Sequence, residues 1–168
     1  MQQLVDLSSA DEQVFQKLEI FLSVVRTTIG KEPEHLEAGI ATLERLRQQT
    51  YEELNQIQHE AMIIRAARFL EVNELGGKNV QWYWNPRQTG TKDEPDLRGI
   101  VAERTEVSAE ITASENPNGA IDKRMRATLE KLSKMPGKKL YFVRTKQMEN
   151  RAITKVAKAG YQIGVRRI

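Results

Sequence analysis

The first 73 residues repeat hydrophobic positions every three or four residues, which is the period of amphipathic helices. Gly30 suits the end of one helix, and Pro33 suits the first turn of the next. Thr50 and Glu53 have the spacing of a capping box, which indicates another helix start. The pattern therefore predicts three helices, over residues 9–30, 33–49 and 50–73.

From residue 80 the hydrophobic period changes to the two-residue alternation of strands. Val80, Trp82 and Trp84, for example, alternate with Gln81 and Tyr83. Turn residues divide the rest of the chain into short elements. We predict strands over 80–85, 96–102, 107–114, 140–145 and 161–168, a loop over 86–95, a turn over 103–106, and helices over 119–135 and 147–159.

The order of these elements predicts the topology of the sheet. Consecutive strands joined by short turns pair antiparallel, whereas strands separated by a helix need a crossover and run parallel. We therefore expect an α/β fold in which a mixed sheet of about five strands is flanked by helices on both faces. Residues 1–49 are predicted to form a helical hairpin extension, and residues 50–168 the α/β core.

Length and composition fit one domain with an extension. The chain has 168 residues and no cysteine, which excludes a disulfide framework and a thiolate metal site. The acidic N-terminus lacks the basic-then-apolar pattern of a signal peptide. No apolar run approaches the roughly 18 residues of a membrane span. We expect a cytoplasmic protein without a membrane partner.

The net charge of +3 conceals an asymmetry between the two parts of the chain. From residue 115 to the end there are 14 Lys/Arg against 4 Asp/Glu, whereas residues 1–114 hold 12 against 19. Such a separation favours a polyanionic partner for the C-terminal part, and nucleic acid is the first choice. The alternative is that these basic residues only solvate exposed helix faces.

Asp96 and Glu110 stand in predicted strands, which usually exclude carboxylates. A turn centred near Arg104 would place Asp96 across from Thr112, with Glu110 its diagonal neighbour on the same face. A divalent cation such as Mg²⁺ would relieve the repulsion between the two carboxylates. The alternative is that Asp96 caps a turn and Glu110 pairs with Arg98 or a nearby lysine.

The segment Pro95-Asp96, followed after thirteen residues by Glu110-Ile111-Thr112, resembles the motif of the PD-(D/E)XK nuclease superfamily, which includes many restriction endonucleases. The order of elements over about 51–145 is also similar to the common core of that superfamily. The resemblance implies a metal-dependent nuclease in which Asp96 and Glu110 hold Mg²⁺, or alternatively Mn²⁺. A third carboxylate often comes from the preceding helix, where Glu60 is the first candidate and Glu53 the second.

This chain has Thr112 where the superfamily has its lysine. The resemblance implies that the lysine positions or activates the attacking water, a role in which Thr112 would hold water without supplying charge. Lys123 of the following helix is our candidate for the missing positive charge. The basic residues of that helix, which could meet phosphates near the carboxylates, are Lys123, Arg124, Arg126, Lys131 and Lys134, with Lys123, Arg124 and Arg126 preferred. Arg144, after the following strand, is a further candidate.

Three functional hypotheses remain open. The first is a Mg²⁺-dependent endonuclease acting on nucleic acid, with DNA favoured over RNA, and working as a homodimer. The second is a non-catalytic nucleic-acid-binding module on the same scaffold, and the third is a protein-interaction domain in which the hairpin is the working surface. His59 has no second histidine at zinc spacing and is expected to be structural.

Overall fold

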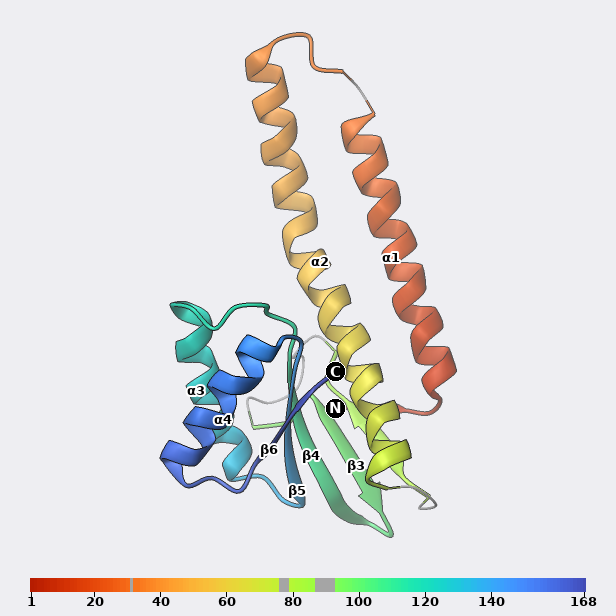
Figure 1. The fold of residues 1–168 in the computed structure, drawn as a ribbon. Helices are drawn as coiled ribbons and strands as arrows, with labels where there is room; N and C mark the ends of the chain where they lie inside the picture. The colour runs from red at the N-terminus through yellow and green to blue at the C-terminus, as the bar shows by residue number, and fades with distance from the viewer. Residues whose placement is uncertain (31, 76–78, 87–92) are drawn as a thin grey trace.

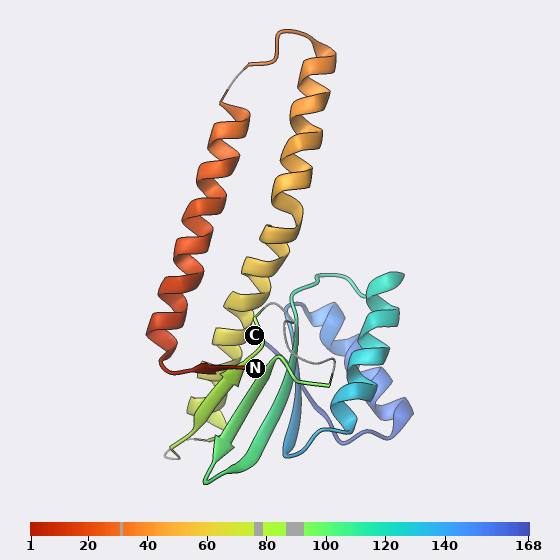
Figure 2. The same cartoon turned by 180° about the vertical axis from the view of Figure 1, so that it is seen from behind.

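A computed structural model describes residues 1–30, 32–75, 79–86 and 93–168. Two long helices form a hairpin, and an α/β core with one mixed sheet is built against its lower half (Figure 1). The upper half of the hairpin projects away from the core, as the reverse view also shows (Figure 2). The predicted turn at Gly76-Gly77 and residues 87–92 of the predicted loop lie outside the described residues.

The hairpin consists of α1 (Leu7–Ile29) and α2 (Leu36–Asn73). The prediction of two helices over 33–73 was wrong, because α2 runs through position 50 without a break. The Thr50 hydroxyl donates to the Leu46 carbonyl at 2.6 Å, a bond made inside a helix rather than at its start. The predicted boundary between hairpin and core, at residues 49 and 50, thus falls inside one continuous helix.

Six strands form one sheet in the described part of the chain, in the order β1-β2-β3-β4-β5-β6. Neighbouring strands from β1 to β4 run antiparallel, and β4, β5 and β6 run parallel. The predicted mixed α/β fold is confirmed, although the short strand β1 was missed. The strands are β1 (Gln2–Leu4), β2 (Gln81–Trp84), β3 (Leu97–Val101), β4 (Arg104–Thr112), β5 (Lys138–Val143) and β6 (Gly164–Arg167).

Helices cover both faces of the sheet, because each strand alternates its side chains between two apolar layers. The hairpin covers one face, where Val107, Ala109 and Ile111 of β4 join its core. Two further helices, α3 (Ala120–Ser133) and α4 (Lys146–Ala159), cover the other face (Figure 1). Glu110 alternates with Ala109 and Ile111, so it faces the α3 side. None of the described helices is both long enough and apolar enough to span a membrane.

The turn between α3 and β5 is pressed closely against β4. Gly137 and Gly160 both have left-handed backbone, with φ of +74° and +68°. A Cβ on Gly137 would lie 2.7 Å from the carbonyl oxygen of Thr105, whereas a Cβ on Gly160 would meet nothing within 4 Å. Alanine at Gly160 would therefore incur only the cost of the left-handed backbone conformation. Alanine at Gly137 would incur that cost and also a steric contact with β4.

We expect Gly160→Ala to lower the free energy of unfolding by about 1 kcal/mol, the cost of a left-handed alanine. Gly137→Ala should lower it by about 2–4 kcal/mol in total, because β4 must also move away from the new methyl group. Denaturant unfolding of both variants measures the difference. Equal losses would show that this turn does not constrain β4.

Candidate functional site

The β3–β4 hairpin turns at Ala102 and Glu103, whose φ angles are +46° and +64°. Positive φ at both central residues is what a two-residue hairpin turn of type I′ requires. A β-bulge then shifts the pairing register beyond Gly99. The turn was predicted over 103–106 but is centred on residues 102 and 103. Neither central residue is a glycine or an asparagine, so the sequence carries no signal for the turn at this position.

This register brings the two predicted carboxylates side by side. Leu97 lies opposite Ala109, so the ladder continued by one residue places Asp96 opposite Glu110. The predicted pairing of Asp96 with Thr112 was wrong by two residues. The predicted shared face is nevertheless retained, because a shift of two residues leaves every side chain on its original side.

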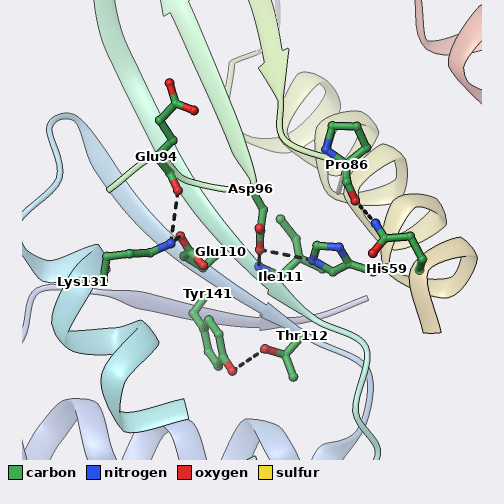
Figure 3. A network of polar contacts seen from close by, with 10 residues as sticks. His59, Pro86, Glu94, Asp96, Glu110, Ile111, Thr112, Lys131 and Tyr141 are labelled. Atoms are coloured by element: carbon green, nitrogen blue, oxygen red, sulfur yellow. Dashed lines mark hydrogen bonds and ion pairs between the residues drawn. The ribbon is translucent and has the colours of Figure 1, made fainter. Parts of the chain in front are cut away.

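Asp96 is buried and held from two directions. Its Oδ2 accepts a hydrogen bond from the Ile111 backbone N–H at 2.8 Å, and His59 Nε2 of α2 lies 3.3 Å from the same oxygen (Figure 3). Burial alone would lower the pKa of the His59 imidazole. The hydrogen bond and charge of Asp96 outweigh burial and hold that pKa above its usual range.

Glu110 is also buried, and its partner is a lysine of α3. Lys131 Nζ lies 2.5 Å from Glu110 Oε1 and donates to the Glu94 carbonyl at 3.1 Å (Figure 3). Burial, and after it the Asp96 carboxylate, raises the pKa of Glu110 to about 8, although Lys131 lowers it. One ammonium group thus compensates only part of the cost of burying the pair.

A pair of hydroxyl groups lies beside the carboxylates. Thr112 Oγ1 and Tyr141 OH are 2.7 Å apart (Figure 3). Burial raises the pKa of Tyr141 to about 12, so this phenol stays protonated at neutral pH. Thr112 and Tyr141 therefore bring neutral hydrogen-bonding groups to the surroundings of the carboxylates.

These side chains line a cleft of about 570 Å³ between α2, the end of β4 and α3. Asp96, Glu110 and His59 lie in its wall together with Thr112 and Tyr141. Arg124 of α3 contributes a cation to the same wall. The cleft wall therefore combines carboxylates, hydroxyl groups, an imidazole and a guanidinium, and Glu52 of α2 is a further carboxylate in it.

The predicted basic residues lie in different places. Arg124 lines the cleft, and Arg144 lines an adjoining hollow, where it forms an ion pair of 3.2 Å with Glu115. Lys123 is exposed and is not part of the cleft wall. Arg126 lines a separate groove between α3 and α4. Arg124 therefore lies in the same cleft as the acidic pair, and Arg144 lies in the hollow next to that cleft.

The two candidate third carboxylates are not part of the cleft wall. Glu60 is fully buried in α2 and pairs with Lys17 of α1, whose Nζ lies 2.6 Å away. Glu53 lies on the partly buried side of α2, outside the cleft wall. No group of three or more His, Cys, Asp or Glu residues suited to one metal ion occurs among residues 1–30, 32–75, 79–86 and 93–168.

The sequence analysis included Lys131 among the basic residues of α3 but did not identify it as the partner of Glu110, and it did not place His59 beside Asp96. Lys131 follows Arg124 by seven residues, two helical turns, so both lie on the same side of α3. This spacing was visible in the sequence, but the side of α3 that turns toward Glu110 is set by how the helix packs on the sheet. His59 was assigned a structural role because only metal partners were sought for it.

Comparison of the chain with family models, with curated proteins and with solved structures found no match. The resemblance to PD-(D/E)XK nucleases therefore rests on the motif residues and the order of elements.

Glu110→Gln should change how stability depends on pH. Folding raises the pKa of Glu110 from 4.5 to about 8, so the folded state retains a proton that the unfolded state loses over this range. Wild-type stability should therefore fall between pH 5 and 8. Relative to wild type, the variant should gain about 1–3 kcal/mol over that interval, because glutamine carries no such proton.

Denaturant unfolding at several pH values checks this, with Glu130→Gln as the control, since Glu130 is exposed and forms an ion pair of 3.1 Å with the exposed Lys134. A Glu110→Gln variant that instead loses stability as the pH rises would show that Glu110 is ionised throughout and acts as the structural partner of Lys131.

Proposed function

We propose that this protein is a Mg²⁺-dependent phosphodiesterase that hydrolyses nucleic acid, with DNA as the first substrate to test. The observation that carries the proposal is the pair of buried carboxylates in the wall of an open cleft, with Asp96 directly before β3 and Glu110 on the adjacent β4. Burying one carboxylate is costly and burying two as neighbours is more so, which makes the pair a candidate functional site.

The donor set of the cleft suits a hard cation. Mg²⁺ prefers oxygen ligands and commonly binds one or two carboxylates while keeping several waters. Asp96 and Glu110 would hold the ion, and a divalent charge would allow both carboxylates to be ionised. When bound, such an ion generates a hydroxide nucleophile and stabilises negative charge on the phosphoryl group. Glu52 of α2 also lines the cleft, but among the described residues it forms no three-residue metal cluster with the pair, which fits an ion that keeps several waters.

The remaining residues have separable roles in the proposed reaction. Lys131 places an ammonium group beside Glu110, which supplies from α3 the positive charge that Thr112 lacks. Its charge would stabilise a phosphate oxygen next to the acidic pair. Thr112 and Tyr141 offer hydroxyls to water or to phosphate oxygens, and His59 fixes the orientation of Asp96.

The charge distribution supports a nucleic-acid substrate. The basic excess lies after residue 114 and includes α3, whose Arg124 faces the cleft. Arg144 extends the cationic surface into the adjoining hollow. A backbone phosphate could therefore reach the acidic pair while flanking phosphates meet arginines, which would give strongly salt-dependent binding.

Asp96→Asn and Glu110→Gln should each reduce Mg²⁺-dependent nicking of plasmid DNA by at least about 100-fold, because each removes a charged ligand. Both variants preserve side-chain size, and circular dichroism checks their folding. Wild-type protein that binds DNA tightly but leaves it intact with Mg²⁺ and with Mn²⁺ would support the non-catalytic binding module instead.

Lys131→Ala should lower the rate of cleavage by about 100-fold, in the range of losing one transition-state donor. Lys134→Ala, three residues later at the end of α3 and in an exposed ion pair with Glu130, should leave the rate within about threefold of wild type. Lys123→Ala should resemble Lys134→Ala, since Lys123 is not in the cleft wall. If Lys123→Ala slowed cleavage and Lys131→Ala did not, Lys123 rather than Lys131 would supply the positive charge beside the acidic pair.

Metal binding has a readout independent of activity. Millimolar Mg²⁺ should raise the melting temperature of wild type, because a ligand that binds only the folded state stabilises it. Glu110→Gln should abolish the rise, whereas Glu130→Gln should retain it. Equal responses of wild type and Glu110→Gln would place any bound metal elsewhere.

A further inference from the structure

Among the described residues, eleven large apolar side chains of α1 and α2 are exposed, and eight of them, each between 39% and 73% exposed, form two rows. Such a concentration is unusual, since apolar residues on a monomer surface are normally scattered singly. We call this set the hairpin face. Its members are Phe15, Leu22 and Ile29 of α1, and Leu36, Ile40, Leu43, Tyr51 and Leu54 of α2.

On α1 the hairpin face follows the inward-facing residues by one position. Val14 is buried and Phe21 packs against the core, and Phe15 and Leu22 come directly after them. Each helical residue is rotated by about 100° from the previous one, so this row lies about a quarter turn from the side that meets α2. Ile29, seven residues after Leu22, continues the row.

On α2 the same offset recurs. Contacts between Thr28 and Gln49, and between Lys17 and Glu60, fix the side of α2 that meets α1. Thr42, Thr50 and Glu53 are partly buried on or near that side. Leu43, Tyr51 and Leu54 each come one position after one of them.

The two rows therefore lie on one side of the hairpin. Each row is rotated in the same sense from the contact between the helices, and α1 and α2 run in opposite directions (Figure 1). For an antiparallel pair, equal rotations carry both rows to the same side. Ile20 and Val24 are also exposed, but they come one position before inward residues and so lie on the opposite side.

The spacing along both helices is that of a helix bundle. Apolar positions 15, 18, 22, 25 and 29 of α1 alternate steps of three and four residues. Positions 36, 40, 43, 47, 50, 54 and 57 of α2 do the same, and all are apolar except Arg47 and Thr50. This seven-residue repeat directs one apolar seam of each helix toward the axis of a four-helix bundle. A single hairpin supplies only half of such a bundle.

The area of the hairpin face matches what a dimer needs. With roughly 170–220 Å² for each fully exposed side chain of this size, the eight together expose on the order of 800 Å². A standard protein–protein interface buries about 800 Å² on each partner.

The charge of this region disfavours a polyanionic occupant. Residues 15–54 contain five Lys/Arg and seven Glu, in contrast to the basic C-terminal part. Nucleic acid would be repelled by this balance. A second copy offers the same mixed charges and the same seven-residue repeat.

We propose that the hairpin face binds the hairpin face of a second copy of this chain and completes a four-helix bundle with two-fold symmetry. Tyr51 belongs both to the hairpin face and to the wall of the cleft, so the dimer contact adjoins the candidate active site. The interaction needs neither metal nor nucleic acid, and it stands or fails independently of the proposed nuclease activity.

Sedimentation equilibrium of the full chain without metal or nucleic acid tests this proposal. Wild type should have twice the 19.2 kDa mass of one chain, with a dissociation constant at or below about 1 µM. Leu43→Glu combined with Leu54→Glu should weaken association by at least about 100-fold, because it places charges inside the apolar contact. Both residues are exposed in the single chain, so the variant should keep its circular dichroism spectrum.

Ile20→Glu combined with Val24→Glu is the matched control on the opposite side of α1, and it should change the dissociation constant by less than about threefold. A monomeric wild type at roughly 100 µM would overturn the proposal. So would a hairpin-face variant that remains dimeric, or equal dissociation of both double variants.

Crosslinking gives a second measurement that requires no charged substitution. The chain has no cysteine, so a single introduced thiol reports only its own surroundings. Ile40→Cys should form covalent dimers with a short bifunctional maleimide, whereas Val24→Cys should not. Equal yields from the two positions would also overturn the proposal.

Discussion

The antiparallel pairing of β3 with β4 is the constraint on which the candidate site depends. Its turn at Ala102 and Glu103 and its bulge beyond Gly99 place Asp96 opposite Glu110. Repulsion between these buried carboxylates is opposed by Lys131 on one side, and by His59 and a backbone N–H on the other. The site is thus assembled from four elements, but the register of two strands decides whether it exists.

Helix α2 connects the two parts of the molecule through its continuity. Its lower half covers the sheet, forms one wall of the cleft and provides His59, while its upper half forms the outer hairpin with exposed apolar residues. A break at residue 50 would have made these halves separate units. Since the helix is unbroken, an association of two hairpins would hold both clefts in a fixed relation to the bundle.

In the proposed site, Thr112 stands where the motif that the chain resembles has a lysine, and the positive charge comes from another element. A lysine on the strand would have approached the carboxylates from β4 itself, whereas Lys131 approaches from α3 and bonds to Glu94 as well. The strand position is then filled by a hydroxyl that pairs with Tyr141. The position of positive charge in such a site therefore depends on helix packing as much as on the strand motif.

The sequence by itself determined the α/β class, most element positions, the parallel β4–β5–β6 arrangement and the shared face of Asp96 and Glu110, because these follow from local periodicity and chain connectivity. It did not determine the continuity of α2, since a capping-box pattern at Thr50 is also compatible with a helix interior. Only the tertiary structure decided that Lys131 meets Glu110, that Glu60 turns toward Lys17 and that Lys123 lies outside the cleft. These pairings depend on the rotation of helices against the sheet, which is set by the packing of many side chains and leaves no local signal in the sequence.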